Sequence, residues 1–248
     1  MNINNEFVLS DMSIGRAEEK ATAPAGTKKT SRSKAAKFGG TVKLPPEPPR
    51  EVRLAAIKAA KNPLLEAAHP LLRALCEVPK TLDADDVETF RQVLEREVTA
   101  FQALCASAQI RHEHAVAASY ALCTALDEAI NRTAWGGGKD GQPGAWATQQ
   151  LAQTFHNDSL GGEKVFLLIG RLAANSHEHI DLIDLLFFVL SMGFEGRYRA
   201  APNGRRELDA IRHRLFDIVA AAHGEVPREL SPNWKGEALG KFRTLTDL

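Results

Sequence analysis

The spacing of apolar residues from Asn62 onward leaves few folds open to this chain. Apolar side chains recur every three or four positions in each sizeable segment, and no segment alternates convincingly as a half-buried strand would. This periodicity gives each helix one apolar face, and such faces must pack against one another. The sequence therefore predicts an all-α fold of seven or eight helices, packed as two small helical bundles.

The helix boundaries follow from the residues that flank each periodic segment. Asn62 and Pro63 form a cap and first-turn pair for one helix, and Pro79 ends it. Glycines end a later helix and open the loop between Trp135 and Trp146, around which we expect the two bundles to join. The predicted helices span about residues 63–78, 83–108, 112–133, 145–155, 163–174, 180–192 and 205–223.

The amino-terminal part of the chain differs in composition from the helical part. Residues 1–55 are rich in Ala, Thr, Ser, Lys and Gly and include a cluster of prolines, which predicts a disordered tail. Nine Lys and Arg stand against five acidic residues in the first 50 positions, a mild basic bias. This bias is typical of a solvated tail, and it leaves open a contact with anionic lipid.

Charge, hydropathy and cysteine content exclude several classes of protein. Lys plus Arg and Asp plus Glu each number 31, so no global basic excess would hold nucleic acid. The start of the chain lacks a secretory h-region, and the most apolar stretch, Leu182 to Phe194, is shorter than the roughly 20 residues of a membrane span. Cys76, Cys105 and Cys123 lie in apolar runs, as buried thiols do in a reducing compartment. We therefore expect a cytoplasmic domain without a disulfide.

Two histidine pairs, His112 with His114 and His177 with His179, raise the question of a metal site. Side chains two positions apart on a helix point about 200° from each other, so neither pair can bind one ion as an i, i+4 pair would. The objection weakens if the second pair lies in a loop, but no third ligand is evident. No nucleophile motif is present either. The sequence predicts no metal, no cofactor and no catalysis.

An acidic pair, Asp127 and Glu128, lies near the end of the third predicted helix. With the apolar face of that helix centred on Cys123, Asp127 falls about 40° from the centre and Glu128 about 140° from it. We therefore expect Asp127 to be half-buried and Glu128 to be more exposed. In one interpretation Asp127 pairs with a neighbouring helix and Glu128 with Arg132. In the other, the carboxylates form part of an acidic groove.

The segment Gly193-Phe194-Glu195-Gly196-Arg197-Tyr198-Arg199 follows the most apolar predicted helix. It could simply connect two helices. Tyr and Arg, however, dominate the energetic centres of protein interfaces, and a short loop between glycines would present them rigidly. We predict that partners contact the following residues: Asp127, Glu128, Phe194, Glu195, Arg197, Tyr198 and Arg199.

These motifs occur in an order that resembles the TssL/DotU family of type VI secretion proteins. The resemblance extends over roughly residues 60–225, and the Gly193 to Arg199 motif is its most specific part. The other matching motifs are Asn62-Pro63-Leu64-Leu65, Leu126-Asp127-Glu128-Ala129-Ile130, Trp135-Gly136, Trp146, Phe155-His156 and Gly161-Gly162-Glu163.

The resemblance implies a hook-like, non-enzymatic domain at the cytoplasmic face of the bacterial inner membrane. It assigns residues 56–225 to the helical cytoplasmic domain and 226–248 to a juxtamembrane segment. A single carboxy-terminal membrane helix would follow in the intact subunit, and we expect it to lie beyond Leu248.

The resemblance also implies partners and a role. Members of the family join the inner-membrane subunit TssM and the outer-membrane lipoprotein TssJ, and their cytoplasmic domains receive baseplate components, above all TssK. The implied function is a structural and docking subunit that links the membrane complex to the baseplate, with self-association of the membrane-anchored protein. In the family the acidic pair borders the cleft between the bundles, a position that falls here to Asp127 and Glu128.

Two functions from other classes remain as alternatives. A helical metallohydrolase would use His156, His177 and His179, and the purified protein would then contain metal. A nucleic-acid adaptor would bind through the basic tail, and its affinity would fall steeply with salt.

Overall fold

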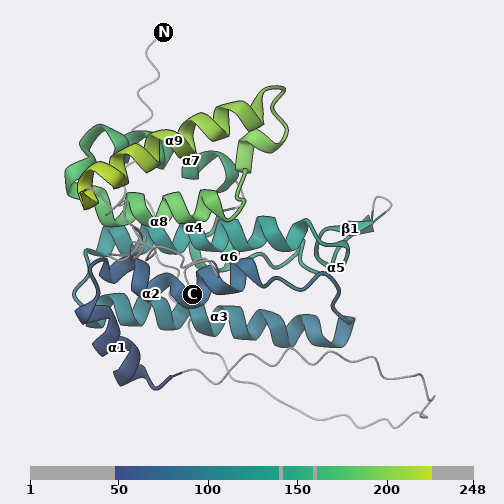
Figure 1. Ribbon diagram of the computed structural model, residues 1–248. Coiled ribbons are helices and arrows are strands. Elements are labelled where there is room, and N and C mark those ends of the chain that lie inside the picture. Colours follow the sequence, from purple (N-terminus) through teal and green to yellow (C-terminus); the bar gives the residue numbers. More distant parts are fainter. Residues whose placement is uncertain (1–47, 140–141, 159–160, 225–248) are drawn as a thin grey trace, which may run out of the picture.

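The computed structural model describes residues 48–139, 142–158 and 161–224, and the all-α fold class is confirmed (Figure 1). Two 3₁₀ helices, η2 (Ala173–His179) and η3 (Gly196–Arg199), connect longer elements. Strands β1 (Gly138–Lys139) and β2 (Gln142–Pro143) pair antiparallel. The α-helices are α1 (Arg50–Ala59), α2 (Pro63–Cys76), α3 (Ala84–Ser107), α4 (His112–Asn131), α5 (Ala134–Gly137), α6 (Leu151–His156), α7 (Gly161–Leu172), α8 (Ile180–Ser191) and α9 (Gly204–His223).

The predicted helices correspond to α2, α3, α4, α6, α7, α8 and α9, and α6 differs most from its prediction. It begins at Leu151 instead of about residue 145, because the chain around Trp146 forms turns. The amide of Ala147 donates to the carbonyl of Gly144 at 3.2 Å, and that of Gln149 donates to the carbonyl of Trp146 at 3.3 Å.

Helix α1 corrects the predicted tail boundary. It begins at Arg50, so the prediction of a disordered tail to residue 55 was wrong at its end. Ile57 of α1 is buried, and Arg53 forms an ion pair with Glu97 of α3 at 3.0 Å. Leu54 also packs against the core, and Arg50 donates a hydrogen bond to the Ser107 hydroxyl of α3 at 3.0 Å, so apolar and polar contacts together hold this helix against the domain. Residues 1–47 and the predicted juxtamembrane segment 226–248 lie outside the described residues.

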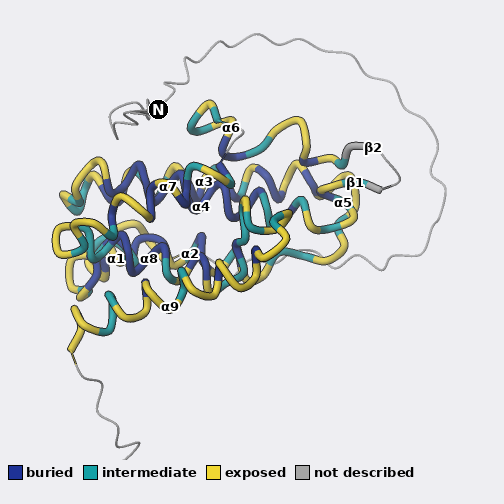
Figure 2. Tube along the Cα trace, turned by 90° about the horizontal axis from the view of Figure 1, so that it is seen from above, coloured by how far each residue is buried: buried dark blue, intermediate teal, exposed yellow. Residues whose placement is uncertain are grey.

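Helix α4 lies at the centre of the fold and is buried along most of its length (Figure 2). It contacts α2, α3, α6, α7 and α8. Small side chains allow this close approach from several directions, because they leave room for the neighbouring backbones. The small buried residues are Ala115, Ala117, Ala118, Ser119, Ala121 and Ala125.

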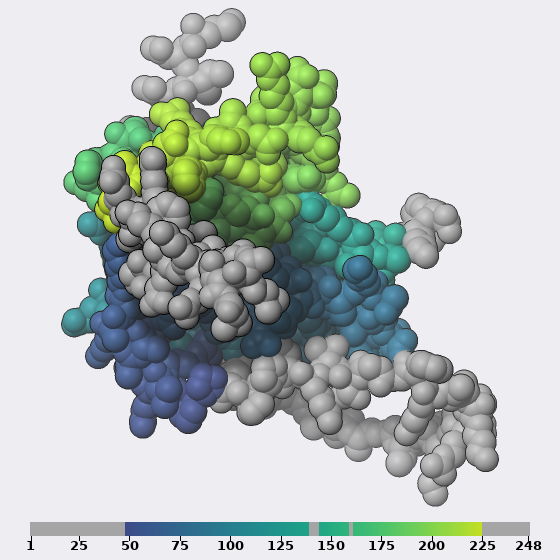
Figure 3. All heavy atoms as spheres, in the orientation of Figure 1, coloured from purple at the N-terminus to yellow at the C-terminus, as the bar shows by residue number. Residues whose placement is uncertain are grey.

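Six of the other helices form two groups around α4. Helices α1, α2 and α3 lie on one side, and α7, α8 and α9 lie on the other (Figures 1 and 3). Helix α8 contacts both α2 and α4, so the groups share one hydrophobic core. This arrangement agrees with the prediction of two packed helical bundles.

Cys105 and Cys123 are buried as predicted, whereas Cys76 at the end of α2 is exposed, so the prediction of burial was wrong for Cys76. Among the helices that the structure describes, none combines the length and the apolarity that crossing a bilayer requires.

Candidate functional site

Asp127 is buried beneath the chain that leads into α6. It is 5% exposed. Its Oδ1 accepts hydrogen bonds from Trp146 Nε1 at 2.7 Å and from the Leu151 amide at 2.9 Å, and its Oδ2 accepts one from the Ala152 amide at 2.8 Å. The prediction of half-burial was wrong, because α4 is enclosed by neighbours and the edge of its apolar stripe does not face solvent. Asp127 instead holds the amino terminus of α6, where a negative charge is favourable.

Opposing influences act on the pKa of Asp127. Burial raises its pKa to about 6, whereas the hydrogen bonds from Ala152, Trp146 and Leu151, together with the nearby charge of Arg91, act to lower the pKa. The Arg91 guanidinium lies 4.4 Å from the centre of the Trp146 ring. Asp127 is therefore part of a buried network that fixes the Trp146 loop.

Glu128 points elsewhere and holds the backbone of the Gly193 to Arg199 segment. Its carboxylate accepts hydrogen bonds from the amide of Glu195 at 3.0 Å and from that of Gly196 at 2.7 Å. The predicted pair with Arg132 is confirmed at 2.5 Å, and Arg132 also pairs with Glu195 at 2.8 Å. The side chain of Glu128 is 14% exposed and Asp127 is buried, so the prediction that Glu128 would be the more exposed carboxylate is confirmed.

Aromatic packing fixes the same segment from within. The Phe194 ring stacks on that of Phe166 in α7, with centroids 5.7 Å apart, and Tyr198 meets Phe166 edge-on at 4.7 Å. Gly196 has φ of +48°, and a Cβ there would lie 2.4 Å from the carbonyl oxygen of Gly162. Only glycine suits this position, so the segment has one well-defined place between α4 and α7.

The partner-contact residues predicted from sequence therefore divide into two classes. Phe194 is 2% exposed and anchors the segment internally. Arg197 and Arg199 are exposed, and Glu195 and Tyr198 are partly exposed. The Arg197 Nη2 donates to the Tyr198 hydroxyl at 2.8 Å. We call the surface formed by Glu195, Arg197, Tyr198 and Arg199 the η3 surface.

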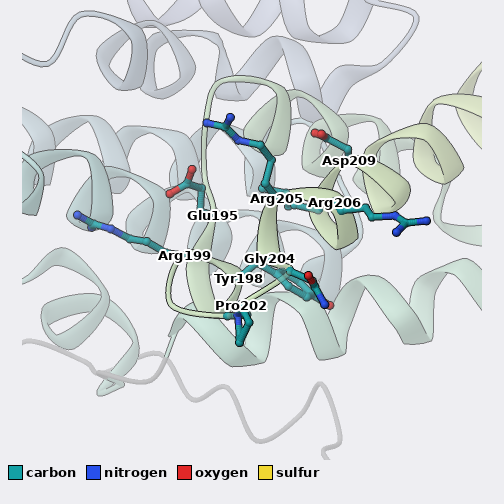
Figure 4. A pocket seen from close by; sticks show the side chains of 11 residues that line it. Glu195, Tyr198, Arg199, Pro202, Gly204, Arg205, Arg206 and Asp209 are labelled. Atoms are coloured by element: carbon teal, nitrogen blue, oxygen red, sulfur yellow. The ribbon is translucent and has the colours of Figure 1, made fainter.

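A pocket of about 600 Å³ opens between the η3 surface and the start of α9 (Figure 4). Gly204 is part of its lining and packs so closely that a Cβ there would lie 1.7 Å from the Tyr198 carbonyl oxygen. Sequence reasoning missed this pocket, and the available signal was the arginine pair that follows Gly204. Its lining includes Glu195, Tyr198, Arg199, Arg205, Arg206 and Asp209.

The histidines meet in a way that sequence spacing did not indicate. His114 Nε2 and His179 Nδ1 lie 2.8 Å apart, so one member of each predicted pair contacts one of the other. Burial, helped by Arg111 and His179, lowers the pKa of His114 to about 4. His156 instead contacts Ser119 Oγ at 3.1 Å.

Metal ligands do not gather in this part of the molecule. Within residues 48–139, 142–158 and 161–224, no group of three or more His, Cys, Asp or Glu side chains is placed to hold a metal ion. The histidine set of the metallohydrolase alternative is therefore not brought together there.

Comparison with known proteins places the chain in a family. The model of the family described as type VI secretion system protein DotU matches residues 63–247. The chain belongs to the DotU family. The matched range contains both carboxylates and the whole η3 surface of this DotU family member, whereas α1 precedes it. None of the curated proteins matches the chain.

Solved structures of TssL proteins share the fold of this DotU family member. The crystal structure of TssL from Vibrio cholerae is 31% identical in sequence with a TM-score of 0.56, and the match covers 64% of this chain and 95% of that one. The cytoplasmic domain of TssL from Acinetobacter baumannii is 21% identical with a TM-score of 0.54, covering 64% and 98% of the two chains. Family membership makes this DotU protein a subunit of the type VI secretion membrane complex that acts with other components of that system.

Proposed function

We propose that this DotU family member is a non-catalytic docking subunit that links the type VI secretion membrane complex to the cytoplasmic baseplate. The observation that carries the proposal is the η3 surface. Its exposed arginines and its partly exposed tyrosine belong to a segment whose backbone is fixed by Glu128 and by the packing of Phe194 on Phe166. In this proposal the domain lies at the cytoplasmic face of the inner membrane and contacts TssK-like and TssM-like subunits. A TssJ-like lipoprotein belongs to the same complex, and the intact protein self-associates.

Rigidity of the η3 surface favours a docking role. A loop that is ordered before binding loses little conformational entropy when a partner arrives. Glu128 holds two amides of this segment, and Phe166 packs against Phe194 and Tyr198. The loop is therefore ordered when the domain folds, and a partner need not order it on binding.

Residue types on the η3 surface support the same role. Tyr and Arg are enriched among interface residues whose truncation weakens binding by about 2 kcal/mol or more. Arg197 and Tyr198 would be the central contacts, with Glu195 and Arg199 around them. Glu128 and Phe194 would act through the loop, and Asp127 would act through the stability of the Trp146 segment.

The proposal is tested by the affinity of the purified domain for the TssK-like subunit of the same secretion cluster. Arg197→Ala and Tyr198→Ala should each weaken binding about 30-fold. Arg214→Ala is the matched control. Arg214 is exposed, has no ion pair among the described residues, and lies nine positions after Arg205, on the opposite face of α9.

Thermal unfolding of each variant separates docking from folding. If Arg197→Ala and Tyr198→Ala bind the TssK-like subunit as the wild type does, the η3 surface is not its docking site. If binding falls only in proportion to lost stability, the residues are structural and the proposal fails. Glu128→Ala should weaken binding as well, because it frees the amides of Glu195 and Gly196.

A further inference from the structure

We infer that the pocket between η3 and α9 binds acidic side chains from a segment of a protein partner. The inference rests on the proposed docking function and adds the chemistry of the partner. Arg199, Arg205 and Arg206 line the pocket and would pair with the partner's carboxylates.

The segment that lines the pocket is locally basic. Between Glu195 and Arg214 the chain has six arginines and three acidic residues, although the whole chain has a formal net charge of zero. The two acidic residues that line the pocket already have partners. Glu195 pairs with Arg132 at 2.8 Å, and Asp209 pairs with Arg212 at 3.0 Å.

The arginines of the pocket, by contrast, have no such partners within the described part of the chain. Arg199, Arg205 and Arg206 are exposed, and none of them forms an ion pair with another described residue. Their guanidinium groups remain available for two-pronged hydrogen bonds to carboxylates.

Shape favours a protein segment over a membrane surface. The pocket is hollow, and Figure 4 shows Arg199 and Arg206 extending to opposite sides of it, with Arg205 in a third direction. A bilayer would meet the arginines through its headgroup phosphates and would leave the apolar lining of the pocket without a partner. A peptide segment can place side chains inside it, where Pro202 and Leu208 add apolar lining.

The pocket is also fixed before any ligand arrives. Gly204, which lines it, lies against the Tyr198 carbonyl, and the amide of Gly204 donates to the carbonyl of Ala201 at 3.0 Å. The Arg212 guanidinium donates to the carbonyl of Leu190, which ties α9 to α8. The arginines therefore project from a backbone that the surrounding helices hold in place.

A capped hexaglutamate peptide with a fluorescent label is the probe, and its anisotropy is measured with the whole 248-residue chain. We expect saturable binding that weakens as NaCl rises from about 50 to 300 mM, because ion pairs are screened. The double variant Arg205→Glu/Arg206→Glu should bind the peptide at least about tenfold more weakly. Arg214→Glu, which also reverses an exposed charge on α9, should bind like the wild type.

The outcomes separate this inference from the docking proposal. Equal loss of peptide binding in Arg214→Glu and in the double variant would overturn the inference, because any surface arginine would then serve. Stronger binding to phosphatidylglycerol vesicles than to the peptide, abolished by the double variant, would also overturn it. Loss of TssK-like binding in Tyr198→Ala, with peptide binding unchanged in the double variant, would overturn the inference and leave docking intact. Loss of peptide binding in the double variant alone, with TssK-like binding unaffected by every η3 variant, would support the inference and refute docking.

Discussion

Replacing Asp127 by alanine tests whether this carboxylate is a structural centre. Three N–H groups would lose their acceptor, those of Trp146, Leu151 and Ala152. All three residues are buried, so water cannot readily replace the carboxylate. An unsatisfied buried donor costs about 1–3 kcal/mol, and local relaxation recovers part of the sum. We expect the free energy of unfolding to fall by about 3–5 kcal/mol.

Urea unfolding at pH 8 measures this loss, because Asp127 is ionised above its pKa of about 6. Asp217→Ala is the matched control, since Asp217 is exposed on α9, and it should change stability by less than about 0.5 kcal/mol. Asp127→Asn keeps one acceptor oxygen and should fall between the two. A loss below about 1 kcal/mol for Asp127→Ala would refute the assigned network.

Two further predictions concern packing and pH. Gly204→Ala should lower the free energy of unfolding by about 1–3 kcal/mol in thermal melts, whereas Gly170→Ala, whose Cβ meets nothing within 4 Å, should be neutral or stabilising. Equal effects of the two would contradict the tight contact at Gly204. The pKa of His114 is lowered from 6.5 to about 4, so the folded state favours the neutral ring. Stability should therefore fall as the pH decreases from about 6.5 towards 4, and His114→Gln should reduce this fall in urea titrations; an unchanged pH profile would contradict it.

Periodicity predicted most of the helices because each has an apolar face that local spacing reveals. Helix α4 shows the limit of that method. Its face centred on Cys123 was identified, but the method assumes an opposite face in solvent, and α4 has neighbours on several sides. The burial of Asp127 was therefore underestimated, although Glu128 is the more exposed of the two as predicted. Helix α1 was missed because only Ile57 and a few flanking residues bury apolar surface within a charged segment.

The candidate site was only partly visible in the sequence. The Gly193 to Arg199 motif marked the η3 surface, because its residue types and glycines are adjacent in the chain. The partners that fix it are distant in sequence, as in the hydrogen bond from the Gly196 amide to Glu128. The same holds for His114 and His179, which meet only in the folded molecule. Spacing along one helix cannot show such contacts.

Photocrosslinking in cells that express the whole secretion cluster tests the docking account most directly. A photoreactive amino acid replaces Arg197 on the η3 surface. As the control it replaces Arg214, which lies on the face of α9 opposite to Arg205. The account predicts a crosslink from position 197 to the TssK-like baseplate subunit and none from position 214. A crosslink to that subunit from position 214, with none from position 197, would contradict it.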